Sequence, residues 1–120
     1  MFAEKKILIC EDDKNLANNM RNYFSLKKAE VQVALSGKEG AMLISSFSPD
    51  VVITDVNMPE IDGYSFLKEL RNLNTTIPII VVTGEHKLQK LFEMEKIEAF
   101  IRKPFSMSDL EEAVLRALGK

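Results

Sequence analysis

The chain is poor in cysteine and histidine, has no excess of basic charge and contains no long apolar run. Its single cysteine, Cys10, cannot form an internal disulfide, and its place inside an apolar run predicts a small buried hydrophobe in a cytosolic protein. No apolar run approaches the ~20 residues that cross a bilayer, and the polar N-terminus predicts no signal peptide. The net charge of −2 argues against a nucleic-acid-binding surface, which is normally basic. We therefore expect a cytoplasmic protein with no direct contact to membrane or nucleic acid.

The length and composition predict one folded domain. The 120 residues are 46% hydrophobic and 28% charged, which is enough to bury a core and unlike a disordered segment. No repeat, low-complexity stretch or linker divides the chain. We expect the domain to span residues 1–120.

Apolar runs alternate with helical patterns along the chain. Five runs are typical of short strands, at residues 7–10, 31–35, 51–54, 79–82 and 99–101. A helical pattern follows each run, including one over residues 86–96. Because parallel strands need crossover connections, this alternation predicts an α/β fold with a doubly wound parallel sheet. The central runs are continuously apolar, as expected for strands that are buried on both faces.

Three helix starts have capping signals. Asp13 is a candidate N-cap for the first helix. Ser36 with Glu39, and Ser108 with Glu111, match the capping-box pattern of a hydroxyl followed three residues later by an acid. We therefore expect the last helix to open at Ser108.

Charged and hydroxyl side chains follow four of the strands. They are Glu11, Asp12 and Asp13 after the first strand, Asp55 after the third, Thr83 after the fourth and Lys103 after the fifth. Ligands of doubly wound sheets bind outside the carboxyl ends of the strands. We therefore expect these side chains to converge on one site.

The acidic part of this set predicts a metal. Carboxylates at Glu11, Asp12 and Asp55 would repel one another without a cation. Carboxylates with waters and a carbonyl oxygen make a typical Mg²⁺ site, whereas the one histidine, His86, lies elsewhere and argues against zinc. For the Glu11–Asp13 stretch alone, a solvated acidic loop is an equal alternative, and the other strand ends favour the site.

Asp55 is also a candidate nucleophile, because an aspartate can attack a phosphoryl group to form an acyl phosphate. Lys103 would neutralise charge on the phosphoryl oxygens, and the Thr83 hydroxyl would donate to one of them. Considered alone, Thr83 is better explained as a β-branched residue that suits a strand end, and Lys103 as a solvated lysine. Only their combination with Asp55 favours the chemistry.

Four segments form an ordered set of motifs. They are residues 7–13 (ILICEDD), 52–59 (VITDVNMP) with Asp62–Gly63, 78–83 (PIIVVT) and 103–105 (KPF). This set resembles a response-regulator receiver domain of two-component signalling, and the resemblance covers essentially the whole chain. It implies a (βα)5 three-layer sandwich with strand order 2-1-3-4-5. The chain departs from the family at Gly84, where alanine is usual, and at Lys96–Ile97, where Gly-Ala is usual.

The resemblance implies that Asp55 is the phosphoacceptor. Asp12, Asp55 and the backbone carbonyl of Asn57 would bind Mg²⁺ directly, with Mn²⁺ as an alternative. Glu11 would hold the metal through water.

The resemblance also implies a switch. Thr83 and Lys103 would hold the phosphoryl oxygens, and the peptide bond before Pro104 would be cis. Phosphorylation would draw Thr83 toward the phosphoryl group and turn Phe100 inward, changing the surface of the fourth helix, fifth strand and fifth helix. The donor would be a sensor histidine kinase or a histidine phosphotransfer protein, and the changed surface would meet a downstream effector. The domain would be a monomer or weak homodimer that catalyses only its own phosphorylation and dephosphorylation.

Three alternatives compete with this interpretation. A phosphatase of the haloacid dehalogenase type needs a second aspartate two residues after the nucleophile, where this chain has Asn57. A flavodoxin-like module needs a phosphate-binding loop after the first strand, where Glu11–Asp13 would repel phosphate. A degenerate receiver, which binds partners without phosphorylation, is disfavoured because the set of Asp12, Asp55, Thr83 and Lys103 is intact.

Overall fold

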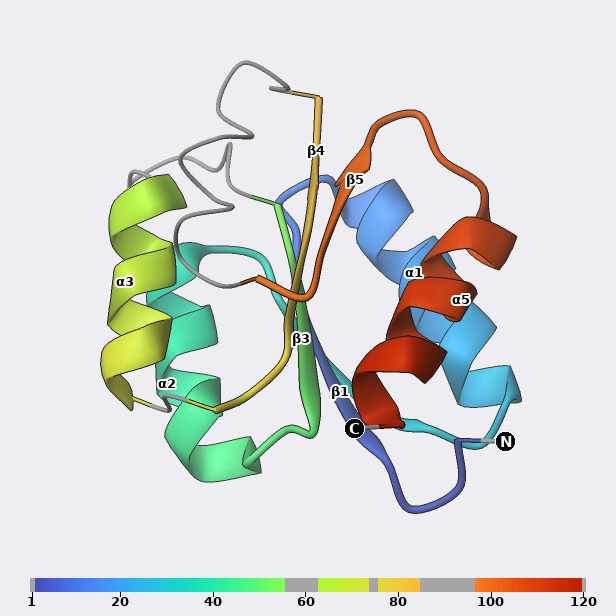
Figure 1. The fold of residues 1–120 in the computed structure, drawn as a ribbon, viewed down its shortest axis with the longest axis horizontal. Coiled ribbons are helices and arrows are strands. Elements are labelled where there is room, and N and C mark those ends of the chain that lie inside the picture. The colour runs from blue at the N-terminus through green and yellow to red at the C-terminus, as the bar shows by residue number, and fades with distance from the viewer. Residues whose placement is uncertain (1, 56–62, 74–75, 85–96, 120) are drawn as a thin grey trace.

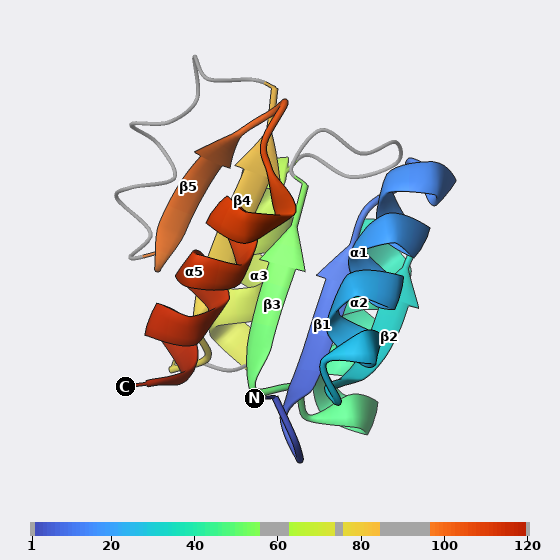
Figure 2. The same ribbon diagram turned by 90° about the vertical axis from the view of Figure 1, so that its right-hand side faces the viewer.

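A computed structural model describes residues 2–55, 63–73, 76–84 and 97–119 and shows a five-stranded parallel sheet between two layers of helices (Figure 1, Figure 2). The strands are β1 (Lys6–Cys10), β2 (Glu30–Ala34), β3 (Val51–Thr54), β4 (Ile79–Thr83) and β5 (Ala99–Arg102). The helices are α1 (Lys14–Leu26), α2 (Gly37–Phe47), α3 (Gly63–Leu73) and α5 (Met107–Leu118). The strand order β2-β1-β3-β4-β5 confirms the predicted doubly wound fold. The helix predicted over residues 86–96 lies outside the described residues.

Each face of the sheet has its own apolar core, because successive side chains of a strand point to opposite faces. Leu8 and Val52 pack with residues of α2 and α3, while Ile7 and Ile53 pack with residues of α1 and α5. Figure 1 shows these two pairs of helices on opposite sides of the sheet. Strands β3 and β4 are buried along their whole length, and β1 is buried after its first residue. The carboxyl ends of the three central strands are therefore held by rigid structure.

Two of the three predicted helix starts are confirmed. The Asp13 carboxylate accepts from the backbone N–H of Asn15 and of Leu16, at 3.0 and 3.2 Å. The Ser36 hydroxyl accepts from the backbone N–H of Glu39 at 3.2 Å. Both caps satisfy helical N–H groups that have no partner within the helix.

The predicted start of the last helix at Ser108 is wrong. The N-cap is Ser106, whose hydroxyl accepts from the backbone N–H of Asp109 at 3.1 Å, and α5 begins at Met107. Ser106 with Asp109 repeats the spacing of Ser108 with Glu111, so the pattern fits both. The extended backbone of Ser106 (φ −91°, ψ 152°) places the boundary two residues earlier.

Helix α2 packs closely on the sheet at Gly40. A Cβ atom there would lie 2.7 Å from Cys10 Sγ on β1 and 3.1 Å from Phe66 Cζ on α3. Cys10 is fully buried, which confirms its prediction as a core residue. Among the helices of the described residues, none combines the length and apolar character needed to cross a membrane.

Candidate functional site

Backbone hydrogen bonds continue past the strands and fix the residues that follow them. The Glu11 N–H donates to the Ala34 carbonyl, and the Asp55 N–H donates to the Cys10 carbonyl, each at 2.9 Å. The Lys103 N–H donates to the Thr83 carbonyl at 3.0 Å. The polar residues after β1, β3 and β5 therefore emerge from one edge of the sheet on a hydrogen-bonded backbone.

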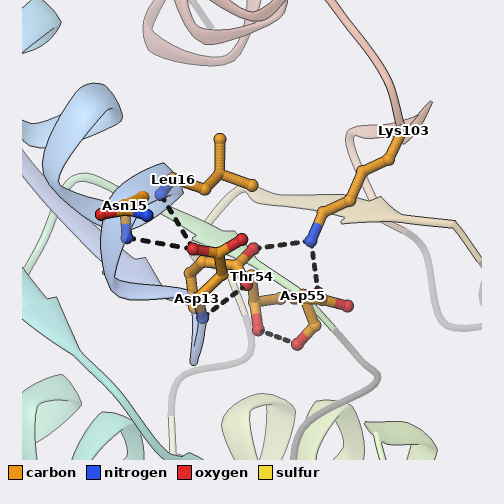
Figure 3. A network of polar contacts seen from close by, with 7 residues as sticks. Asp13, Asn15, Leu16, Thr54, Asp55 and Lys103 are labelled. Carbon is orange, nitrogen blue, oxygen red and sulfur yellow. Dashed lines mark hydrogen bonds and ion pairs between the residues drawn. The ribbon is translucent and has the colours of Figure 1, made fainter.

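The Lys103 ammonium joins two of the predicted acids. Its Nζ donates to Asp55 Oδ2 at 2.6 Å and to Glu11 Oε1 at 2.9 Å. Figure 3 shows the Lys103 side chain reaching from its own segment to Asp55. The Glu11 and Asp55 side chains are only 2% and 6% exposed, whereas that of Lys103 is 26% exposed. One cation that follows β5 thus bridges buried carboxylates that follow β1 and β3.

The pKa shifts follow from this arrangement. Burial raises the pKa of Glu11, and the hydrogen bonds from Lys103 and from the Asp13 N–H only partly oppose it. Burial by itself lowers the pKa of Lys103, but hydrogen bonds to Asp55 and Glu11 outweigh it and leave that pKa raised. Lys103 is therefore a cation at neutral pH.

Asp13, the third acid of the first motif, has a structural role. The Glu11 Oε2 atom accepts from the Asp13 backbone N–H at 3.1 Å, and the Asp13 carboxylate caps α1. Figure 3 shows Asp13 beside the Asn15 and Leu16 backbone, to which it is hydrogen bonded. Asp13 thus anchors the start of α1 beside the site.

The other three acids form an oxygen-lined cluster. Glu11, Asp12 and Asp55 each offer a carboxylate oxygen, and these atoms lie within 4.8 Å of one another. With the Lys103 ammonium, the three carboxylates leave a net charge of −2, which a divalent cation would neutralise. A hard, all-oxygen donor set fits Mg²⁺, which is bound through one or two carboxylates and several waters.

The structure places the other predicted residues as follows. Thr83 is fully buried as the last residue of β4. Phe100 is half-buried on β5, lies opposite Val81 in the β4–β5 pairing and packs against the core under α2 and α3. The Lys103–Pro104 peptide bond is cis. Asn57 lies outside the described residues.

Thr54 is a polar residue of the site that the sequence pattern does not single out. It is fully buried, and its hydroxyl donates to the Asp55 carbonyl at 2.8 Å, as the close view in Figure 3 shows. The available signal was a hydroxyl that directly precedes the acid at the end of an apolar run.

A cavity of about 480 Å³ opens beside Lys103. It lies between the first half of α1 and the segment that leads into α5, and its lining residues are Asp13, Asn15, Leu16, Asn19, Lys103, Pro104 and Phe105. The cavity therefore opens beside Lys103, the residue that contacts Asp55 and Glu11.

Comparisons with known proteins agree on one family. Residues 7–115 match the family model of the response regulator receiver domain. The chain is 35% identical over 120 residues to the regulatory protein AtoC of Escherichia coli, covering 98% of this chain and 26% of that protein. It is 37% identical over 121 residues to the transcriptional regulatory protein RprY of Bacteroides fragilis, covering 97% of this chain and 51% of that protein. The chain thus spans about a quarter to half of these relatives.

Solved structures give the same result. A putative response regulator from Chloroflexus aurantiacus superposes with a TM-score of 0.89 at 30% identity, over 97% of this chain and 98% of that one. A CheY-like receiver domain protein from Methanospirillum hungatei superposes with a TM-score of 0.90 at 26% identity, over 96% and 94% of the two chains.

Proposed function

The chain belongs to the response regulator receiver family of two-component signalling, and from that premise we propose that it is a phosphorylation-dependent switch with Asp55 as phosphoacceptor. The observation that carries the proposal is the Lys103 ammonium held 2.6 Å from Asp55 and 2.9 Å from Glu11 at the sheet edge. We take residues 1–120 as one receiver unit acting in the cytoplasm.

The transfer step uses Asp55 as nucleophile. A carboxylate oxygen attacks the phosphorus of a phosphohistidine, the P–N bond breaks, and its electron pair stays on the imidazole nitrogen. Asp55 then carries an acyl phosphate, which water later hydrolyses. Lys103 would neutralise the negative charge that develops on the phosphoryl oxygens, and the Thr83 hydroxyl would donate a hydrogen bond to one of them.

The acidic cluster would hold Mg²⁺ through Asp12, Asp55 and the Asn57 carbonyl, with Glu11 acting through water. When bound, the metal supplies positive charge to the phosphoryl oxygens. The fit rests on three carboxylates within 4.8 Å whose charge exceeds that of Lys103. Mn²⁺ would suit the same oxygen ligands.

The donor would be a sensor histidine kinase or a histidine phosphotransfer protein. Its phosphohistidine would approach through the cavity between α1 and the segment before α5, where Lys103 lies in the wall. The signal would leave through Thr83 and Phe100. These two residues lie on the adjacent strands β4 and β5, and Phe100 faces the side of the sheet that α2 and α3 cover. A downstream effector would bind the changed surface.

The test is phosphorylation in solution. Wild type and Asp55→Asn are incubated with acetyl phosphate, with and without Mg²⁺, and the intact mass is measured. We expect a single phosphoryl adduct on wild type that requires Mg²⁺, and none on Asp55→Asn. Absence of a wild-type adduct would favour a receiver that works without phosphorylation. An equal adduct on Asp55→Asn would refute the site.

A further inference from the structure

Both backbone polar groups of Asp55 are held by neighbouring residues. Its N–H donates to the Cys10 carbonyl at 2.9 Å, and its carbonyl accepts from the Thr54 hydroxyl at 2.8 Å. The pairing of β3 with β1 and with β4 ends at Thr54, so the Asp55 carbonyl lies just beyond the regular ladder. The Thr54 side chain therefore adds a hydrogen bond to Asp55 at the end of the ladder.

This contact bears on where the Asp55 carboxylate points. The direction of a Cα–Cβ bond is fixed by the backbone N, Cα and C atoms, and aspartate has only two side-chain torsions beyond it. Hydrogen bonds on both sides of Asp55 therefore limit how far its carboxylate can shift from Lys103, 2.6 Å away. We propose that Thr54 is a positioning residue for the phosphorylation of Asp55, a role that rests on the function proposed above.

The surroundings of Thr54 favour this role over simple packing. Its neighbour two residues earlier on the same face is Val52, and the residue opposite on β1 is the buried Cys10. A valine would fill the same volume in this apolar core without the cost of burying a hydroxyl. The hydroxyl is tolerated because it is hydrogen bonded, to the backbone carbonyl of Asp55 and to the Cys10 thiol beside it.

The test separates the hydroxyl from the shape of the side chain. Thr54→Val keeps the shape and removes the hydroxyl, whereas Thr54→Ser keeps the hydroxyl and removes the methyl group. Thr54→Ala and Thr54→Ser form a second pair that differ only in the hydroxyl, should the valine variant not fold. The matched control is Ile53→Val, which removes a buried methylene from the adjacent residue and leaves the hydrogen bond intact.

Each variant is incubated with Mg²⁺ and acetyl phosphate well below its melting temperature, and the rate of acyl phosphate formation is followed by intact mass. We expect Thr54→Val to react about tenfold more slowly than wild type, because small displacements of a reacting group are costly. Thr54→Ser should stay within about twofold of wild type, and Ile53→Val should react normally although its melting temperature falls.

Three results would overturn the inference in distinguishable ways. Equal rates for wild type and Thr54→Val would show that the hydroxyl only stabilises the fold. Equally slow Thr54→Ser and Thr54→Val would assign the effect to packing of the methyl group. A wild type that forms no adduct would remove the proposed function, and this role with it.

Discussion

Replacing Lys103 with methionine tests the electrostatics of the site most directly. Methionine keeps an unbranched stem but lacks the ammonium that donates to Asp55 at 2.6 Å and to Glu11 at 2.9 Å. Both carboxylates are nearly buried, and Asp12 contributes a third negative charge within 4.8 Å. The variant therefore leaves three acids together without their cation.

The size of the effect follows from burial. Removing one partner of a fully buried ion pair costs about 3–5 kcal/mol, whereas exposed pairs contribute less than about 1 kcal/mol. The Lys103 side chain is 26% exposed, so water reaches one end of this pair. We therefore expect the free energy of unfolding to fall by about 2 kcal/mol at neutral pH without divalent metal.

The loss should depend on pH. Burial already raises the pKa of Glu11 above its ordinary 4.5, and the Lys103 hydrogen bond opposes that rise. In the variant this opposition is gone, so the pKa of Glu11 rises further. As the pH falls toward 4.5, the folded variant takes up a proton before the unfolded chain does, which stabilises the folded state. The difference from wild type should therefore shrink on acidification.

Urea unfolding followed by circular dichroism measures these quantities, at neutral and mildly acidic pH, with EDTA or with excess Mg²⁺. We expect Mg²⁺ to stabilise Lys103→Met more than wild type, because the metal would replace the missing charge. The control is Lys38→Met at an exposed lysine of α2, which should change stability by less than about 0.5 kcal/mol. The reasoning is refuted if Lys103→Met is as stable as wild type in EDTA, or if its deficit does not change with pH.

The structure predicts the results of three further experiments. Gly40→Ala should lower the free energy of unfolding by about 1–3 kcal/mol, because the new Cβ would lie 2.7 Å from Cys10 Sγ. This loss should exceed the gain of about 1 kcal/mol from the better helix propensity of alanine. A variant that is more stable than wild type in urea unfolding would contradict this. Gly84→Ala should gain about 0.4–1 kcal/mol, because Gly84 is exposed, has no positive φ and would place its Cβ more than 4 Å from the described residues other than its chain neighbours. A lower melting temperature would count against it. Burial raises the pKa of the Cys10 thiol to about 12. A thiol-specific reagent at mildly alkaline pH should therefore label Cys10 only as the protein unfolds. Native protein that is labelled as fast as denatured protein would be inconsistent with that burial.

The convergence of the site could be predicted because it depends on topology. Once strands ending at Cys10 and Thr54 are parallel neighbours, the residues that follow them must meet at one edge. The caps at Asp13 and Ser36 were equally predictable, since a side chain that bonds a backbone two or three residues ahead is a local event.

The N-cap of α5 and the role of Thr54 could not be predicted, because the sequence fits two interpretations of each equally well. Ser106 and Ser108 both precede an acid by three residues, and only the backbone path after Lys103–Pro104 selects Ser106 as the cap. Thr54 reads as a strand former in an apolar run, and its role depends on the rotamer that turns its hydroxyl to the Asp55 carbonyl.

The sequence by itself determined which chemical groups the chain brings to the carboxyl edge of the sheet. Strand alternation and the order of four motifs are enough for that, because hydrophobic periodicity and crossover connections leave few arrangements open. Only the tertiary structure decided how those groups meet: that Lys103 bridges Glu11 and Asp55, and that the Thr54 hydroxyl bonds the Asp55 backbone. The Lys103 contacts join segments that are distant in the chain, and the Thr54 contact depends on a side-chain rotamer, so neither can be deduced from sequence spacing.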